Sequence, residues 1–315
     1  MNLRINVLYV VLLSVILFFT GCATFRPGAP AGTIDVIAHR GASQRAPENT
    51  MAAFRLAHEM GADWFELDCH LTRDQEIILI HDGDLERIAG IKAPVSDYDL
   101  EALRKMDAGS WKNERFAGEP LPTLGEALDF AKNRIGVYVE IKNQTDDSAL
   151  MAQLLERAKD NTVMTPALAH TFMDAIETSG TRNLILTRST IAEIRKRHME
   201  KGVVIQSFSP VICAIARIEA PEMRVELLSG VEADKHEEWE QVCRWVFLLD
   251  VHGLNISAKG ITPGRLAAIQ GTGKTMAVYT VDTAEEISRF AGWGVDAIIT
   301  NCPDLCLKVL GRKQK

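Results

Sequence analysis

Carboxylates occupy alternate positions in one apolar segment of the sequence. Residues 64–70 read WFELDCH, so Glu66, Asp68 and His70 stand at every second position and apolar residues stand between them. Because successive side chains of a β-strand point to opposite faces, this alternation gathers the polar groups on one face. Two ionised carboxylates buried side by side repel each other and are costly to desolvate unless a cation pairs with them. The segment therefore predicts a strand that presents a cation site.

A second segment repeats this arrangement. Residues 137–142 read VYVEIK and place Glu140 and Lys142 on one face. The oxygen donors Glu66, Asp68 and Glu140, with no Cys or His at matching spacing, suit a hard cation such as Ca²⁺ or Mg²⁺ better than zinc. We expect these carboxylates to bind one divalent cation.

Two histidines follow apolar runs in the same part of the chain. His39 comes directly after three apolar residues, and His81 comes after four. Imidazole can act as a base or an acid near neutral pH, and breaking a phosphodiester needs both. Arg40 offers a bidentate contact to a phosphate, and Lys142 adds a point charge. The pattern indicates phosphoryl transfer; the alternative is that the carboxylates only form ion pairs with Arg40 or Lys142.

These groups stand late in short apolar runs that alternate with amphipathic segments from residue 33 onward, which is the pattern of a parallel α/β sheet covered by helices. The expected strands are 34–38, 64–70, 77–81, 137–142, 203–208, 225–228, 254–257, 276–281 and 297–300. Helices are expected at 50–60, 124–133, 148–159, 190–201 and 284–292, among others. Eight repeats with one accessory hairpin predict a (β/α)₈ TIM barrel, which places active-site groups at the carboxyl ends of its strands. The alternative is a doubly wound open sheet.

Two segments interrupt this alternation. The segment 83–122 contains three prolines, short polar turns and one expected helix near 100–106, so we predict a small insertion after the second strand. The segment 163–188 contains two strand-like runs, 167–171 and 184–187, that the barrel pattern does not place. It is a candidate lid or partner surface.

The first 21 residues have the layout of an export signal. Arg4 precedes an uncharged apolar run of about 13 residues, which is too short for an ordinary membrane span. The sequence FTGC, which ends at Cys22, resembles the lipobox of bacterial lipoproteins. It predicts a lipidated Cys22 that anchors the protein to a membrane, a tether at 22–32 and a folded domain at 33–312. We expect a place in the bacterial cell envelope, at the periplasmic face of the outer membrane; a plain secretory signal and a retained anchor are the alternatives.

The composition is that of a globular protein, with 47% hydrophobic and 24% charged residues. A net charge of −7 argues against a nucleic-acid groove, because phosphate neutralisation needs a basic surface. Besides Cys22 there are five cysteines, without paired C-x-x-C spacing. We expect buried or free thiols, at most one or two disulfides, and no zinc site.

Several short motifs together resemble those of one enzyme family in order and spacing. They are HRG at 39–41, PENT at 47–50, GAD at 61–63, ELD at 66–68, HD at 81–82 followed by Leu85 and Arg87, and DAGSW at 107–111. With the later strands they resemble the glycerophosphodiester phosphodiesterase family from about residue 36 to residue 307.

This resemblance implies a TIM-barrel enzyme that hydrolyses glycerophosphodiesters to an alcohol and glycerol 3-phosphate. In this family the glycerol hydroxyl beside the phosphate can act as the nucleophile and give a cyclic phosphate. The residues that the resemblance assigns are His39 and His81 as acid and base in either order, Glu66, Asp68 and Glu140 as metal ligands, and Arg40 and Lys142 as phosphate ligands. Glu48 would enter or support the site, and Asn49 would orient its loop.

The sequence departs from the family pattern at two places. Arg87 is followed by Ile-Ala-Gly where threonines are common, and Tyr279 stands where Trp is frequent, so the preferred substrate stays open. The alternatives within enzymes are a lysophospholipase D and a phospholipase C-like activity on membrane lipids. The alternative outside enzymes is a non-catalytic surface lipoprotein that keeps the barrel as a scaffold.

Overall fold

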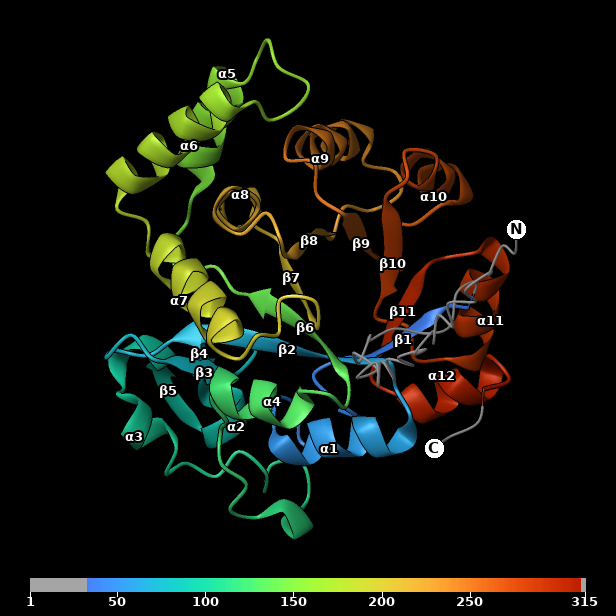
Figure 1. Ribbon diagram of the computed structural model, residues 1–315. Coiled ribbons are helices and arrows are strands. Elements are labelled where there is room, and N and C mark those ends of the chain that lie inside the picture. The colour runs from blue at the N-terminus through green and yellow to red at the C-terminus, as the bar shows by residue number, and fades with distance from the viewer. Residues whose placement is uncertain (1–32, 313–315) are drawn as a thin grey trace, which may run out of the picture.

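The computed structural model describes residues 33–312, and within them eight parallel strands close into a barrel (Figure 1). Around the barrel they are β1 (Asp35–Ala38), β2 (Trp64–Leu71), β6 (Gly136–Ile141), β7 (Val203–Ser207), β8 (Arg224–Ser229), β9 (Gly253–Ser257), β10 (Thr275–Tyr279) and β11 (Ala297–Thr300). β11 pairs in parallel with β1, which also pairs with β2, so the ring of eight strands is closed. The predicted TIM barrel is confirmed, and the open sheet is excluded.

Helices surround the strands (Figure 1). The longer ones are α1 (Met51–Met60), α4 (Leu124–Ala131), α5 (Ser148–Arg157), α6 (Pro166–Ser179), α7 (Arg182–Lys196), α8 (Pro210–Glu219), α9 (His236–Leu248), α10 (Pro263–Gln270), α11 (Ala284–Trp293) and α12 (Pro303–Val309). Several begin at a threonine or serine cap; the Thr50 hydroxyl, for example, accepts from the Ala53 amide and starts α1.

The two faces of β2 have the predicted contents. Phe65 points outward, is fully buried, and stacks on Phe54 of α1 with ring centroids 4.4 Å apart. Trp64 points inward, where it meets Tyr138 of β6 edge to face at 5.2 Å. The amino-terminal half of the barrel interior is therefore filled by apolar side chains, and the polar groups of β2 follow in its carboxyl-terminal half.

The segment 163–188 corrects one prediction. Its two strand-like runs, 167–171 and 184–187, are helical and belong to α6 and α7, and the helix expected at 190–201 begins eight residues earlier, at Arg182. Thr165 caps α6, and Pro166 occupies its first turn, where the missing amide costs nothing. Apolar runs of four or five residues do not distinguish a strand from a buried helix face.

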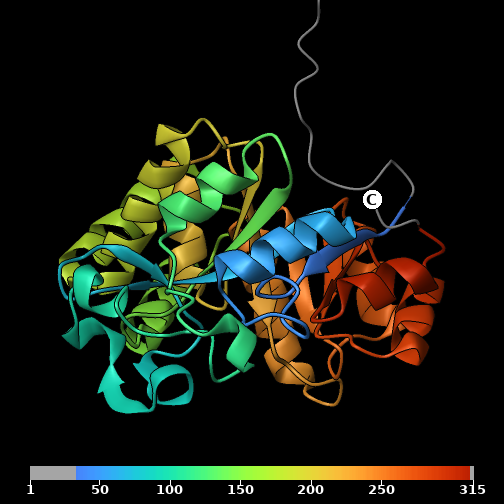
Figure 2. The ribbon, with the colours of Figure 1, turned by 90° about the horizontal axis from the view of Figure 1, so that it is seen from below.

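The insertion predicted at 83–122 is present and follows β3 (Ile77–Leu79), a short strand antiparallel to β2. It contains β4 (Asp84–Leu85), α2 (Glu86–Ala89), β5 (Ile91–Pro94), η1 (Val95–Asp97), α3 (Leu100–Leu103) and η2 (Glu114–Phe116). Buried apolar residues such as Leu85, Val95 and Leu103 give it a small core of its own. Figures 1 and 2 show this insertion, in teal, gathered at one side of the barrel.

Some predictions fall on other parts of the chain. The signal segment, Cys22 and the tether lie outside the described residues. All five cysteines within residues 33–312 are free thiols, and four of them are buried. Among the described helices, none has the length and apolar character required to cross a membrane.

Candidate active site

Three carboxylates converge inside the barrel at the carboxyl ends of β2 and β6. Asp68 and Glu140 are direct partners in the register of these strands, and Glu66 lies one inward position earlier on β2. Their exposed fractions are 1% for Glu66, 0% for Asp68 and 7% for Glu140. One oxygen from each lies within 4.8 Å of the others. The grouping predicted from alternation is therefore present.

Cations contact two of the three carboxylates. The Lys142 ammonium lies 2.6 Å from Glu140 Oε1 and 3.0 Å from Asp68 Oδ1, and Arg40 Nε lies 3.4 Å from Asp68 Oδ2. Glu66 accepts hydrogen bonds from the Arg40 backbone amide at 2.8 Å and from Gln206 at 3.5 Å. The ion pair between Lys142 and Glu140 that the sequence offered as the alternative is therefore present. Lys142 also contacts Asp68, so the pair forms inside the cluster of three carboxylates and does not replace it.

The site carries more negative than positive charge. Burial, reinforced by Asp68, raises the pKa of Glu66 well above its usual range and that of Glu140 to about 7. Burial also disfavours ionised Asp68, but Lys142 and Arg40 outweigh it and hold the pKa of Asp68 below its usual range. A divalent cation fits this donor set, because hard carboxylate oxygens are the ligands of Ca²⁺ and Mg²⁺ and their mutual repulsion needs a counter-charge.

Three carboxylates, those of Glu66, Asp68 and Glu140, face two cations, Arg40 and Lys142, within the site. When all five groups are ionised, one negative charge is left without a counter-charge from these side chains.

His39 follows β1 directly, and a series of hydrogen bonds through Asn301 to Asp282 holds its ring. Its Nδ1 lies 2.8 Å from Asn301 Oδ1. Both the backbone amide and the side-chain amide of Asn301 donate to Asp282, at 2.8 and 2.6 Å. Because a carboxylate only accepts, Asp282 fixes the Asn301 oxygen toward His39, so His39 Nδ1 is the donor and Nε2 is unprotonated. Burial lowers the pKa of His39 to about 4, which keeps the imidazole neutral at neutral pH.

His81 follows β3 and has a charged partner instead. Its Nδ1 lies 2.7 Å from Asp82 Oδ1, and its backbone carbonyl lies 3.2 Å from His70 Nε2. The His70 ring is held in turn by Gln144. Burial lowers the pKa of His81, and the contact with Asp82 works against that shift. His70, which shares the inward face of β2, thus supports the loop of His81.

The loop after β1 positions Arg40, Glu48 and Asn49. Arg40 and Asn49 both have φ near +55°, and the intervening Gly41 has φ +79°. Glu48 accepts from the Arg40 guanidinium at 2.9 Å. Asn49 donates to Asp68 Oδ2 at 2.7 Å and accepts from the Asp68 amide at 3.0 Å, so it ties this loop to β2.

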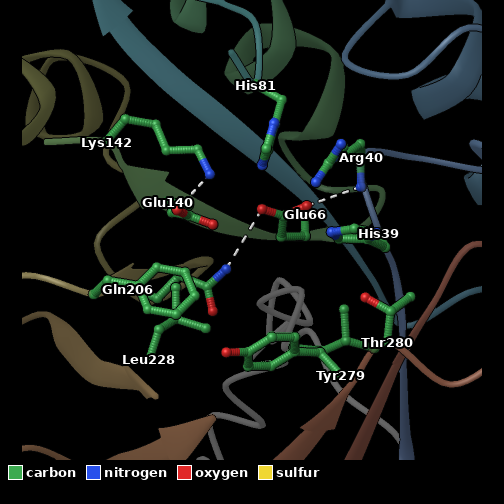
Figure 3. Close-up of a pocket in the computed structure, with 12 residues that line it drawn as sticks. His39, Arg40, Glu66, His81, Glu140, Lys142, Gln206, Leu228, Tyr279 and Thr280 are labelled. Atoms are coloured by element: carbon green, nitrogen blue, oxygen red, sulfur yellow. Dashed lines mark hydrogen bonds and ion pairs between the residues drawn. The ribbon is translucent and has the colours of Figure 1, made fainter. Parts of the chain in front are cut away.

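A pocket of about 150 Å³ opens over these groups. Its polar lining comes from His39, Arg40, Glu66, His81, Glu140, Lys142 and Gln206 (Figure 3). An apolar wall faces them, formed by Phe208, Leu228, Tyr279 and Ile299. Of the residues singled out in the sequence, Asp68 and Asn49 lie buried beneath the pocket, and Glu48 lines a neighbouring hollow.

Three supporting residues were not singled out from the sequence for a role. Gln206 lies inward on β7, where Asn255 of β9 fixes its amide by donating to it at 2.8 Å. Asn301 follows β11 as His39 follows β1, so its place at a strand end was a usable signal. Asp282 lies in a loop after β10, and its position carries no such signal.

A closed parallel barrel that brings imidazoles, carboxylates and cations to one pocket is a hydrolase scaffold with the acid, base and anion-binding groups that cleavage of a phosphodiester needs. The pattern of the Glycerophosphoryl diester phosphodiesterase family matches residues 39–305. A "Glycerophosphodiester phosphodiesterase" of Caldanaerobacter subterraneus is 30% identical over 87% of this chain and 97% of its own. One of Bacillus subtilis is 26% identical over 87% and 85%. The chain therefore belongs to the glycerophosphodiester phosphodiesterase family and is a phosphoric diester hydrolase.

Solved structures show the same fold. A glycerophosphodiester phosphodiesterase from Agrobacterium tumefaciens superposes with a TM-score of 0.66 at 25% identity, over 88% of this chain and all of its own. A phosphodiesterase from Oleispira antarctica, solved with the product sn-glycerol-3-phosphate, has a TM-score of 0.70 at 22% identity, over 88% and 96%. At that identity the second likeness concerns the fold alone.

Proposed function

We propose that this enzyme hydrolyses glycerophosphodiesters to an alcohol and glycerol 3-phosphate with the help of one divalent cation, Ca²⁺ or Mg²⁺. The observation that carries the proposal is the meeting of Glu66, Asp68 and Glu140 beside His39 and His81 around one small pocket. The family match and the names of the relatives support the substrate class.

Each charged group has a distinct task in this proposal. Glu66, Asp68 and Glu140 would hold the cation, which supplies Lewis-acid stabilisation of charge on the phosphoryl oxygens. The Arg40 guanidinium and the Lys142 ammonium both reach the pocket and would bind the phosphate anion. Glu48 would keep Arg40 in place through its contact with the guanidinium.

The partners of the two imidazoles favour His39 as the base and His81 as the acid. Asn301 is neutral and leaves Nε2 of His39 free to accept a proton. Asp82 is anionic and stabilises a protonated His81. Both imidazoles line the same pocket as Glu66 and Arg40 (Figure 3).

The reaction then has two balanced steps. His39 removes the proton of the glycerol hydroxyl next to the phosphate, the hydroxyl oxygen bonds to phosphorus, and the bond to the leaving alcohol breaks as His81 protonates its oxygen. In the second step the roles reverse. His81 takes a proton from water, and the water oxygen bonds to phosphorus. The bond from phosphorus to the glycerol oxygen that attacked in the first step then breaks, and His39 protonates that oxygen. Attack within one molecule benefits strongly from proximity.

An assay on glycerophosphocholine tests the proposal. The purified protein should release choline and glycerol 3-phosphate with Ca²⁺ or Mg²⁺, lose activity after EDTA treatment and regain it when the cation is restored. Full activity after chelation would contradict the cation site, and no hydrolysis of any glycerophosphodiester would contradict the substrate class.

One observation favours a lipid substrate as a second candidate. Phe208 is 45% exposed and extends the apolar wall of the pocket, where an acyl chain could lie. A lysophospholipase D or phospholipase C-like activity would use the same polar groups. The comparison of kcat/KM for glycerophosphocholine and long-chain lysophosphatidylcholine decides between the two, and Phe208→Ser should lower only the lipid activity.

We also propose that the enzyme is a lipoprotein of the cell envelope, on the basis of the FTGC sequence at Cys22. Expression of the full chain in a bacterium should place it in the membrane fraction. Cys22→Ser should remove incorporation of labelled palmitate; unchanged labelling would contradict the proposal.

A further inference from the structure

Arg87 of α2 links the insertion to two loops of the active site. Its Nε donates to Asp82 Oδ2 at 2.7 Å, and its two terminal nitrogens donate to Glu48 Oε2 and Oε1 at 2.9 and 2.8 Å. All three nitrogens of the guanidinium are thus used on two carboxylates. We call this set, Arg87 with Asp82 and Glu48, the Arg87 clamp.

Each carboxylate of the Arg87 clamp also contacts one side chain that lines the pocket. Asp82 Oδ1 contacts His81 Nδ1 at 2.7 Å, and Glu48 Oε1 accepts from the Arg40 guanidinium at 2.9 Å. His81 follows β3, whereas Arg40 follows β1, so the clamp joins loops from different parts of the barrel. Rotation of either carboxylate would turn the group that it holds.

We propose that Arg87 is a positioning residue: through Asp82 and Glu48 it fixes the directions of His81 and Arg40, which makes the insertion part of the active site. The inference rests on the phosphodiesterase function proposed above. Arg87 itself is absent from the lining of the pocket, so it acts through the two carboxylates. A planar guanidinium can make three directed bonds to two carboxylates, whereas a lysine supplies the charge without the geometry.

A purely structural role for Arg87 makes different predictions, and Arg104 serves as the matched control. Arg104 also belongs to the insertion, and its guanidinium pairs with both oxygens of Glu126 at the start of α4. Arg104 does not line the pocket. Loss of Arg104 removes its two bonds to Glu126, and loss of Arg87 removes three bonds to two carboxylates, but only the second change frees groups of the pocket.

The test compares Arg87→Met, Arg87→Lys and Arg104→Met with the parent on glycerophosphocholine at saturating divalent cation. We expect kcat of both Arg87 variants to fall by about 10- to 100-fold, the scale for small misplacements of catalytic groups and for loss of their supporting partners. KM should rise more in the Met variant than in the Lys variant, which keeps the positive charge. Arg104→Met should keep kcat within about twofold of the parental value, although its melting temperature should fall by about as much as that of Arg87→Met.

Chemical rescue separates position from stability. Guanidinium ion at millimolar concentration should restore part of the kcat of Arg87→Ala, since it can occupy the vacated place, and should leave Arg104→Ala unchanged. Parental kcat in Arg87→Lys, or no rescue of a folded Arg87→Ala, overturns the proposal. If Arg87→Ala does not fold, the kcat of Arg87→Lys decides alone.

A readout without catalysis distinguishes failure of this inference from failure of the proposed function. An inactive parent would contradict the proposed function, but histidine-selective ¹⁵N NMR would still report on the clamp. At a pH high enough to keep His81 neutral, its signal, identified by its loss in His81→Gln, should show one Nδ1–H tautomer in the parent and a mixture in Arg87→Met. Identical spectra would overturn the inference.

Discussion

Replacement of Glu140 by Gln is expected to abolish activity. In the metal-free state, the stability of the variant relative to that of the parent should increase as pH rises. Burial, reinforced by Asp68, raises the pKa of Glu140 from 4.5 to about 7 in the metal-free protein. An acid whose pKa is raised by folding stabilises the fold only while it is protonated. Between pH 4.5 and pH 7 the unfolded chain releases this proton while the folded protein keeps it, so stability is lost as pH rises through that window.

The size of the effect follows from the two pKa values. A rise from 4.5 to about 7, at about 1.4 kcal/mol per unit, corresponds to about 3 kcal/mol lost once the pH exceeds the folded pKa. The amide introduced by Glu140→Gln does not titrate, so the variant escapes this loss. The contact with Lys142, which lies 2.6 Å from Glu140, is a charged pair only once Glu140 is ionised, and the pKa of about 7 already includes its effect. The difference in unfolding free energy, variant minus parent, should therefore increase by about 3 kcal/mol between pH 4.5 and pH 8.

Urea unfolding of both proteins in EDTA, at intervals between pH 4.5 and pH 8, measures this difference. Saturation with Ca²⁺ or Mg²⁺ to about 100 times Kd should stabilise the parent by about 2.7 kcal/mol and the variant by less. Glu226→Gln is the control, because Glu226 is equally buried in the barrel but pairs with Arg224 and lies outside the three-carboxylate group. A difference that stays flat across this pH range, or a cation response of Glu140→Gln equal to that of the parent, would refute the reasoning.

The remaining predictions concern proton transfer and loop geometry. His39→Ala and His81→Ala should each lower kcat on glycerophosphocholine by about 100-fold or more, and a variant with parental kcat has no part in proton transfer. Asn301→Leu frees the His39 tautomer, so kcat should fall by about tenfold or more while KM changes little; a rise in KM alone would contradict the role given to Asn301. Gly41→Ala should lower the melting temperature far more than Gly118→Ala, because both have φ near +80° but only at position 41 would the new Cβ lie 2.6 Å from α1. Equal melting temperatures would show that the loop after β1 yields to the added methyl group.

The strands and the groups they carry could be predicted from the sequence because strand periodicity fixes the direction of each side chain. Once 64–70 and 137–142 are strands of one parallel barrel, Glu66, Asp68 and Glu140 must point inward near its carboxyl end. The structure adds only the register, which sets Asp68 opposite Glu140. The error at 163–188 has the same origin, since a run of four or five apolar residues is too short to reveal whether its period is 2 or 3.6.

The contacts between loops could not be predicted in this way. Asp282 fixes Asn301, and Arg87 joins Asp82 to Glu48, across sequence separations of 19, 5 and 39 residues. No periodicity relates such residues, because loops have no fixed repeat and their side chains meet only after the barrel has closed. The position of Asn301 at a strand end was a usable signal, but nothing in the sequence alone tells which neighbour orients it.

This division between strands and loops has a consequence for function. The carboxylates borne by strands are held by the barrel sheet itself, whereas the directions of His39 and His81 depend on Asn301, Asp82 and the loops around them. Changes at Asn301 or Asp82 should therefore lower kcat while leaving affinity for the cation nearly intact. Changes to the strand carboxylates, or to Asn49, which donates to Asp68, should weaken the cation site first. Because the groups that orient the imidazoles come partly from the insertion, variation in the insertion can alter turnover without disturbing the barrel that holds the metal ligands.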